Sequence, residues 1–392
     1  MISKAPAALA VAVALAVGGV VPATAQGPIR IGASLSLTGT YAQPGRYQHE
    51  GYQLCQKDLN AKGGLLGRQV EFVVYDDQSN PATGVRLYEK LITEDKVDGV
   101  MGPYSSAISE AVASVTEKYN KVNVAPLAAT TSIFKKGRKY MFMVISPAEV
   151  YLEGLIDIAA KRGLKTVAII NEDTLFPKTS AQGTADLAKK AGLQVVFTEA
   201  YPKGNQDFSA LLTKVKAANP DVLAAATYFD DAVAIARQMR ELSVNPKMLG
   251  VTVGGDIPKF QELLKGTADY IYGSSQWEAT LPYPGAKEFN EAYIKQFKQE
   301  PSYHSAAGYA GCMLYAEGVK KAGSLDADKV REALLALKTR TMFGDYQVDK
   351  DGFQTAHKMV LLQWQDGKRV VVWPDDLSSG KPRFPTPPWN AR

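Results

Sequence analysis

The chain has 392 residues and a formal net charge of +5, with 45 Lys and Arg against 40 Asp and Glu. The basic residues are scattered, whereas a nucleic-acid-binding protein usually shows a basic stripe, so we expect no nucleic-acid partner. The length exceeds what one hydrophobic core supports, so two domains are expected.

The first 25 residues have the pattern of a secretory signal peptide. Lys4 supplies a positive start, residues 7–21 are almost all small or apolar, and Ala23-Thr24-Ala25 fits a signal-peptidase site. The apolar run is shorter than the about 20 residues of a membrane-spanning helix. We therefore predict a signal peptide at 1–25, cleaved after Ala25, and a periplasmic protein. A retained N-terminal anchor is the alternative.

Short β-rich runs then alternate with helical stretches. The predicted strands are 29–35, 70–75, 97–101, 122–125, 140–144, 166–170, 194–199, 222–227, 248–252 and 270–274. The predicted helices are 46–60, 83–94, 108–119, 150–161, 179–190, 208–218 and 232–242. This alternation is typical of a parallel sheet with helices on both faces. Because it occurs twice, with a break at Ser146-Pro147, we predict an α/β fold of two doubly wound parallel-sheet lobes.

The last third of the chain is mainly helical, at 287–299, 303–321 and 326–337. A short strand at 346–348 and a hairpin of 359–363 and 370–373 follow, with Asp366-Gly367 as its turn. The proline-rich residues 378–392 predict an extended strap without a core of its own.

Three neighbouring strands end in small residues next to hydroxyls, at 36–41, 102–106 and 126–132. Ligands of open α/β sheets bind beyond the carboxyl ends of the strands, where hydroxyls and helix-start N–H groups favour an anion. The alternative is that these Ser and Thr residues only cap helices.

Several segments resemble the branched-chain amino-acid binding proteins of ABC transporters. They are IRIGASLSLTGTYAQPG, GVMGPYSSAISEAV, VAPLAATTS, GNQDFSALLTKVKAANPDVL and, most specifically, NAKGG followed by YDD. The resemblance runs from about residue 29 to the C-terminal hairpin. It implies a type I periplasmic binding protein, a clamshell whose chain crosses between lobes near 144–146, 274–277 and 342–345.

The resemblance also implies the organisation and the partners. The N-terminal lobe would comprise 26–145 and 276–344, and the C-terminal lobe 146–275 and 345–392 with the strap. The protein would bind a small carboxylate by lobe closure and deliver it to an inner-membrane ABC permease, as a monomer without a cofactor.

By the same resemblance, Ser106, Ala128, Ala129 and Thr130 hold the ligand carboxylate in the first lobe. Tyr104 and Ser105, in the loop at 102–106, would line this seat. In the second lobe, Phe176 and Tyr228 would close over the ligand, and Trp277 lies at the second crossing. An aromatic residue at a strand end can equally serve packing alone.

The loop after strand 248–252 departs from the family pattern. Amino-acid-binding members hold the α-ammonium there with an acidic residue, but this loop carries Gly254 at its centre, and Asp256 comes a few residues late. A buried ammonium without a counter-charge is costly, by about 1–3 kcal/mol or more. We therefore favour an aromatic acid such as a benzoate or cinnamate, with a branched-chain or other amino acid as the alternative.

The start of the first helix supplies further candidates. Tyr41, Gln43, Arg46 and His49 carry groups that can donate to a carboxylate or a phenol oxygen. Arg46 and His49 can equally face solvent.

An enzyme is not expected, because His49, His304 and His357 are isolated and no H-E-x-x-H, P-loop or G-x-S-x-G motif occurs. No metal site is expected either. A cytoplasmic ligand-sensing regulator of the same fold is a further alternative, against which the signal peptide argues. Cys55 and Cys312 lie among apolar neighbours on two predicted helices, which favours buried free thiols over the disulfide that export would permit.

Overall fold

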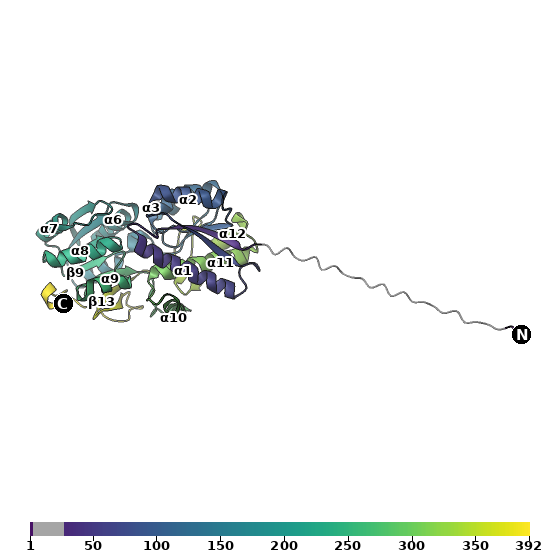
Figure 1. Cartoon of the computed structure of the whole chain (residues 1–392). Coiled ribbons are helices and arrows are strands. Elements are labelled where there is room, and N and C mark those ends of the chain that lie inside the picture. Colours follow the sequence, from purple (N-terminus) through teal and green to yellow (C-terminus); the bar gives the residue numbers. More distant parts are fainter. Residues whose placement is uncertain (3–26) are drawn as a thin grey trace.

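The computed structural model describes residues 1–2 and 27–392. The predicted signal peptide therefore lies, apart from its first two residues, outside the described residues and stays a prediction. Figure 1 shows two lobes side by side, one carrying α1, α2, α11 and α12 and the other α6 to α9. None of the helices within the described ranges has the length and apolarity needed to cross a bilayer.

The first lobe is built on a five-stranded sheet in which every pairing is parallel, in the order β2-β1-β3-β4-β5. Its strands are β1 (Ile29–Leu35), β2 (Val70–Asp76), β3 (Gly99–Met101), β4 (Asn123–Ala125) and β5 (Met141–Met143). The early helices are α1 (Ala42–Ala61), α2 (Pro81–Thr93), α3 (Ser106–Lys118) and α4 (Thr131–Phe134). The last third adds α10 (Ala286–Phe297), α11 (Tyr303–Ala322) and α12 (Ala327–Leu335).

The second lobe is built on a seven-stranded sheet in the order β14-β13-β10-β9-β8-β6-β7. Its strands are β6 (Thr166–Glu172), β7 (Gln194–Tyr201), β8 (Val222–Ala226), β9 (Met248–Val251), β10 (Tyr272–Ser275), β13 (Val360–Gln365) and β14 (Lys368–Trp373). The helices are α5 (Glu153–Lys161), α6 (Leu175–Lys190), α7 (Ser209–Ala218), α8 (Phe229–Glu241) and α9 (Pro258–Leu264). β13 pairs antiparallel with both β10 and β14, which places the C-terminal hairpin at this sheet's edge.

Local sequence explains these elements. β8 reads Val-Leu-Ala-Ala-Ala and is buried throughout, as a central strand of a parallel sheet should be. α2 begins at Pro81 because Asn80 caps it, accepting hydrogen bonds from the backbone N–H groups of Ala82 and Thr83. Asp230 in the first turn of α8 favours its N-terminus electrostatically.

The predicted fold class is confirmed, and each predicted strand and helix is present with its ends shifted by a few residues. Three short helices and strands were not predicted, namely α4, α9 and β11 (Lys338–Thr341), which pairs antiparallel with β12 (Gly344–Gln347). They are four, seven and four residues long, too short for a hydrophobic period to show.

The residues between β12 and β13 contact the first lobe before the chain joins the second sheet. The Gly352 carbonyl accepts from Met143 N at 2.8 Å, and Lys135 forms ion pairs with Asp349 and Asp351. The lobe boundaries assigned from the sequence stay predictions. The proline-rich tail contacts the second lobe, where Trp389 Nε1 donates to the Val244 carbonyl at 2.8 Å.

The prediction of free thiols is wrong, because Cys55 and Cys312 form a disulfide across 257 residues, with their Cα atoms 6.3 Å apart. The last third of the chain returns to the first lobe and packs α11 against α1. Glycines allow this close approach: a Cβ at Gly51 would lie 2.3 Å from the Ser305 carbonyl oxygen. The separation of Cys55 and Cys312 in the sequence was therefore no argument against their pairing in the folded protein.

Loss of this disulfide should destabilise the protein. We expect Cys55→Ser with Cys312→Ser to lower the free energy of unfolding by about 2–4 kcal/mol, because the cross-link restricts the unfolded chain. Urea unfolding followed by circular dichroism measures this. A reducing agent should lower the free energy of unfolding of the wild type by a similar amount and leave that of the double variant unchanged. Two titratable thiols in the denatured, unreduced wild type would contradict the disulfide.

Candidate functional site

A small cavity lies in the cleft between the lobes, and both lobes line it. The first lobe contributes Tyr104, Ser105, Ser106, Leu127 and Tyr303, and the second lobe Tyr151, Phe176, Tyr228 and Val253. The cavity holds about 10 Å³, room for about one water molecule. A larger guest therefore requires the lobes to part, and since the lining is divided between them, such a movement widens the cavity.

The elbow between β3 and α3 presents two serine hydroxyls. Ser105 Oγ accepts from Ile108 N at 3.3 Å and so caps α3. Ser106 Oγ accepts from Ala129 N at 3.2 Å, which joins this elbow to the next one. Each hydroxyl accepts in these bonds and keeps its own hydrogen for a further acceptor. The capping alternative thus holds for Ser105 and does not prevent either serine from donating to a ligand.

The second elbow is buried behind Ser106. Ala128 and Ala129 are buried, and the Ala129 carbonyl accepts from Ala148 N at 2.8 Å. Thr130 Oγ1 is buried and has no hydrogen-bond partner within the described residues. A buried hydroxyl without a partner carries a free-energy cost, which a ligand that accepted its hydrogen would relieve. Thr130 does not line the cavity in its present shape.

Aromatic rings from both lobes fill the cleft around Tyr228. Its ring centroid lies 4.3 Å from that of Tyr41, 5.6 Å from that of Phe176 and 6.1 Å from that of Tyr104. Tyr151 packs edge-on against Phe176 at 4.9 Å. These separations lie in the range that favours tilted ring contacts. Of the predicted aromatic candidates, Tyr104, Phe176 and Tyr228 line the cavity, and Tyr41 lies directly behind Tyr228.

Five other candidates do not line the cavity. Trp277 is buried at the second crossing, where Nε1 donates to the Met342 carbonyl at 2.8 Å and the ring packs edge-on against Phe289. The other four are Gln43, Arg46 and His49 on α1, and Gly254 beside Val253. Arg46 is exposed, which agrees with the alternative that it faces solvent, and His49 is half-buried.

Four lining residues were not predicted. Leu127 and Val253 stand in loops that the sequence singled out, but an apolar side chain carries no chemical signal. Tyr151 lies just before α5, and Tyr303 is the first residue of α11. Both helical segments begin where the chain comes back to the cleft. An aromatic residue at such a position is the signal that could have identified them.

A pair of buried carboxyl groups lies behind the aromatic layer. Tyr41 Oη donates to Glu172 Oε1 at 3.2 Å, and Tyr201 Oη donates to Asp231 Oδ2 at 3.1 Å. Burial, and then the neighbouring Glu172 carboxyl, raises the pKa of Asp231 to about 7; burial also raises the pKa of Glu172. Because Tyr41 belongs to the first lobe and Glu172 to the second, their hydrogen bond joins the two across the cleft.

A lysine makes a second contact across the cleft. Lys203 Nζ, of the second lobe, donates to the Ser79 carbonyl of the first lobe at 2.7 Å and lies 4.2 Å from the centroid of the Tyr41 ring. Its positive charge also faces Glu172, and the two charges attract. The cleft is therefore held by polar contacts as well as by aromatic packing.

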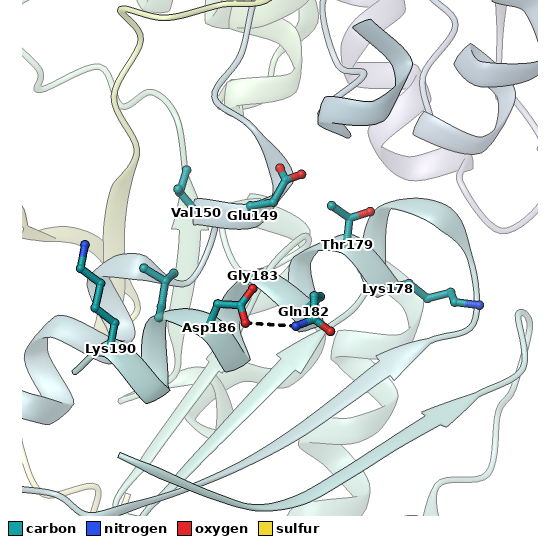
Figure 2. A pocket seen from close by; sticks show the side chains of 9 residues that line it. Glu149, Val150, Lys178, Thr179, Gln182, Gly183, Asp186 and Lys190 are labelled. Atoms are coloured by element: carbon teal, nitrogen blue, oxygen red, sulfur yellow. Dashed lines mark hydrogen bonds between the residues drawn. The ribbon is translucent and has the colours of Figure 1, made fainter. Parts of the chain in front are cut away.

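Larger hollows lie on the outer surface. One of about 520 Å³ follows α6 and includes Lys178, Gln182 and Asp186, with Gln182 Nε2 donating to Asp186 Oδ1 at 3.1 Å (Figure 2). Another of about 600 Å³ lies on the first lobe, beside α10 and α11. Neither is lined by a predicted site residue or by both lobes. Within the described ranges, no group of three or more His, Cys, Asp and Glu residues could hold a metal ion.

A family model described as periplasmic binding protein matches residues 28–369. The chain belongs to the periplasmic binding protein family. Leu/Ile/Val-binding protein homolog 7 of Brucella suis biovar 1 (strain 1330) is 28% identical over 404 residues, covering 96% of this chain and 98% of that protein. The resemblance to the branched-chain amino-acid binding proteins is thereby confirmed.

Solved structures agree with this family fold. The leucine binding protein LivK of Thermotoga maritima MSB8 superposes with a TM-score of 0.81 at 25% identity, covering 89% of this chain and all of that one. An R. palustris solute binding protein in complex with benzoate superposes with a TM-score of 0.80 at 20% identity, covering 88% of this chain and 96% of its own. The protein is thus a substrate-binding component of an ABC transporter with an extracytoplasmic location, in a family associated with transport rather than catalysis.

The buried carboxyl pair makes stability depend on pH. The folded protein binds a proton at Asp231 that the unfolded chain releases between about pH 4 and pH 7, so this group's contribution to stability falls as the pH rises through that window. We expect Asp231→Asn, whose amide oxygen can still accept from Tyr201, to raise the free energy of unfolding at pH 8 by on the order of 1–3 kcal/mol.

Urea unfolding between about pH 4 and pH 8 measures the effect. Near pH 4 the variant and the wild type should be about equally stable, since the wild-type carboxyl is then neutral. The control Asp186→Asn removes an exposed carboxylate of the same lobe and should leave the shape of the pH profile unchanged. A constant difference between Asp231→Asn and wild type across the range would contradict the assignment.

Proposed function

We propose that this periplasmic binding protein captures a small carboxylate, with an aromatic acid such as a benzoate or cinnamate favoured, and delivers it to an inner-membrane permease. The observation that carries the proposal is the lining of the cleft cavity. It combines the hydroxyls of Ser105 and Ser106 with rings from both lobes and contains no carboxylate side chain.

The ligand carboxylate would sit at the N-terminus of α3. Backbone N–H groups and the helix dipole favour negative charge there, and the two serine hydroxyls can each donate a hydrogen bond. With the lobes apart, the Thr130 hydroxyl is a further donor within the same lobe. The carboxylate seat thus belongs to the first lobe alone, so the ligand can dock before the lobes close.

The second lobe would complete the site by closing. Phe176 and Tyr228 then cover the ligand's apolar part, and Tyr41–Glu172 and Lys203–Ser79 contacts form across the cleft. Ligand binding shifts the open–closed equilibrium because the ligand contacts Phe176 and Tyr228 in the closed form only. A micromolar dissociation constant corresponds to about −8 kcal/mol, which a few charge-assisted hydrogen bonds and one buried ring can supply.

A branched-chain amino acid is the second candidate. The curated relative from Brucella suis is described as a Leu/Ile/Val-binding protein homolog, which supports this ligand. Glu172 and Asp231 could attract its ammonium if Tyr41 moved aside, but both carboxyl groups are buried behind the rings. Asp256, in the loop after β9, is buried beside His304 and does not line the cavity. The absence of a lining carboxylate therefore favours a ligand without an amine.

Export and oligomeric state complete the proposal. Cleavage after Ala25 would release the mature protein into the periplasm, where the Cys55–Cys312 disulfide can form and persist. The protein would act there as a monomer.

The ligand class can be tested by a thermal-shift screen of the mature protein with benzoate, cinnamate, leucine and valine. We expect the aromatic acids to raise the melting temperature, because a ligand that binds only the folded state stabilises it. Sodium chloride at the same concentration serves as the control for ionic strength. A shift with leucine or valine and none with the aromatic acids would reverse the preferred ligand.

The carboxylate seat can be tested by the double variant Ser106→Ala with Thr130→Ala. Removing both donors should weaken binding by about tenfold or more, as measured by isothermal titration calorimetry. The control Ser114→Ala with Thr213→Ala removes two exposed hydroxyls that bond only carbonyls of their own helices. Unchanged affinity in the first variant would show that the seat lies elsewhere.

A further inference from the structure

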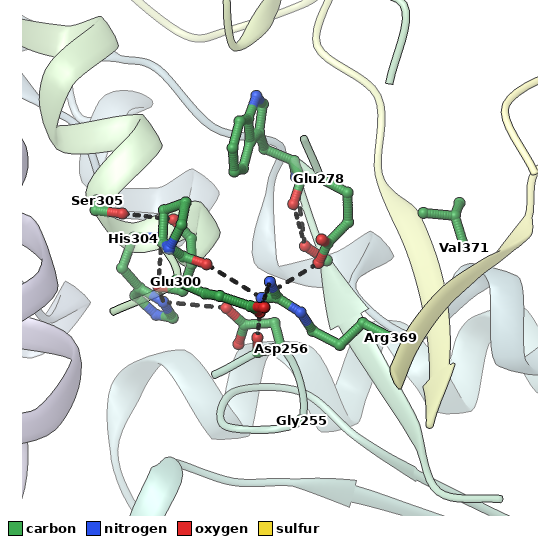
Figure 3. Close-up of polar contacts among 12 residues, drawn as sticks. Gly255, Asp256, Glu278, Glu300, His304, Ser305, Arg369 and Val371 are labelled. Atoms are coloured by element: carbon green, nitrogen blue, oxygen red, sulfur yellow. Dashed lines mark hydrogen bonds and ion pairs between the residues drawn. The ribbon is translucent and has the colours of Figure 1, made fainter. Parts of the chain in front are cut away.

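A buried polar chain runs from the cavity into the body of the protein. Tyr104, which lines the cavity, has its hydroxyl 3.3 Å from Nε2 of His304, and Nδ1 of His304 lies 3.4 Å from Oδ2 of Asp256. His304 and Asp256 are fully buried. His304 belongs to the first turn of α11, and Asp256 comes from the loop after β9, so the chain also joins the two lobes (Figure 3).

No group in the described residues forms a hydrogen bond with the Asp256 side chain. Neither carboxylate oxygen has a hydrogen-bond partner, although the Asp256 backbone carbonyl accepts from Arg369 Nη1 at 2.6 Å. Arg369 also bonds the Pro301 carbonyl at 3.2 Å and Glu300 at 3.2 Å, next to the start of α11. The guanidinium thus fixes the backbone on both sides of the contact and leaves the carboxylate facing His304.

The charges around this chain are mostly negative. Asp256, Glu278 and Glu300 surround the single guanidinium of Arg369, and Glu278 Oε1 lies 3.5 Å from Nη1. Burial raises the pKa of Glu278 to about 7. In such a setting a buried carboxylate without a donor is costly.

The partners of His304 indicate where its hydrogens lie. Ser302 caps α11 by accepting from His304 N at 3.2 Å, so the Ser302 hydroxyl hydrogen is free to point at Nδ1, 3.2 Å away. A neutral ring that accepts there carries its hydrogen on Nε2. A neutral ring that donated from Nδ1 to Asp256 would instead leave Nε2 bare and accept the Tyr104 hydrogen. Of the two Nδ1 contacts, only the one with Ser302 is a hydrogen bond, because neither Asp256 carboxylate oxygen has a hydrogen-bond partner within the described residues. We therefore assign the hydrogen to Nε2, which can donate it to the Tyr104 oxygen.

This direction determines what Tyr104 offers the cavity. A phenol oxygen that accepts from His304 keeps its own hydrogen for another acceptor. Burial raises the pKa of Tyr104 well above its usual value, so the phenol stays protonated. Directed into the cavity, that hydrogen can reach a ligand carboxylate beside Ser105 and Ser106.

We propose that His304, whose Nδ1 accepts from the Ser302 hydroxyl, is a positioning residue that holds the Tyr104 phenol so that its hydrogen points at the ligand carboxylate. The role rests on the proposed function, since it deepens the recognition of a carboxylate in the same cavity.

A double-mutant cycle tests the chain with benzoate as the calorimetric probe and leucine in a second arm. Tyr104→Phe and His304→Leu should each weaken binding about fivefold to tenfold, and the double variant should be no weaker than either single one. His304→Gln, whose amide can still donate to Tyr104, should restore most of the affinity. Asp256→Asn should weaken binding less than His304→Leu.

The control cycle pairs His304→Leu with Tyr228→Phe, whose hydroxyl has no recorded contact with His304, and should be additive. Additive losses in the Tyr104 cycle, or no rescue by His304→Gln, would overturn the proposal.

A ligand-free measurement is independent of the proposed function: nitrogen-15 NMR should find a hydrogen on His304 Nε2 and a shift of that signal in Tyr104→Phe. A bare Nε2 would overturn the proposal. If the wild type binds neither probe, the proposed function fails and the NMR result alone decides the positioning role.

Discussion

The close packing of α11 against α1 is the constraint on which the site depends. It returns the last third of the chain to the first lobe, where glycines at Gly51 and Gly308 let the backbones approach and the Cys55–Cys312 bond fixes them. The start of α11 then stands beside the elbow of β3 and α3. Tyr303 and His304 meet Tyr104 there across about 200 residues of sequence. A change in how these helices pack would therefore reach the cavity directly.

Polar groups at the cleft fall into two layers with different tasks. The inner layer consists of hydroxyls whose hydrogens remain available, above all those of Ser105 and Ser106, and these suit an anion. The outer layer holds the carboxyl groups of Glu172 and Asp231, whose pKa values burial raises, and it contacts the first lobe through Tyr41. Under the proposed function, this arrangement keeps negative charge behind the rings, so that the cleft can favour a carboxylate and still close through hydrogen bonds between the lobes.

The fold could be predicted further than the site. Strands such as β8 and helices such as α2 are marked by local sequence, through an apolar run or a capping residue. Their alternation along the chain was therefore enough to predict two doubly wound lobes. Part of the cavity was predicted too. The strand end before the elbow at 102–106 singled out Tyr104 and Ser105, and the family resemblance added roles for Ser106, Phe176 and Tyr228. Tyr151 and Tyr303 carried a weak signal, as aromatic residues at the start of helical segments, that was not used. The disulfide depends on where distant segments meet, which no local pattern contains. Trp277 had the right residue type, but its indole N–H satisfies a backbone carbonyl and its ring packs on Phe289.

The small volume of the cavity bears on selectivity under the proposed function. Tyr41, Tyr104, Phe176 and Tyr228 lie at ring–ring distances of 4.3–6.1 Å, so the closed cleft is stabilised by contacts among its own rings. A guest must replace those contacts as it enters. A planar aromatic acid offers ring faces and edges of the same kind, whereas an aliphatic side chain offers only dispersion. An ammonium would in addition meet no carboxylate on the cavity wall. The ring packing and the inner hydroxyls therefore favour the same ligand for independent reasons.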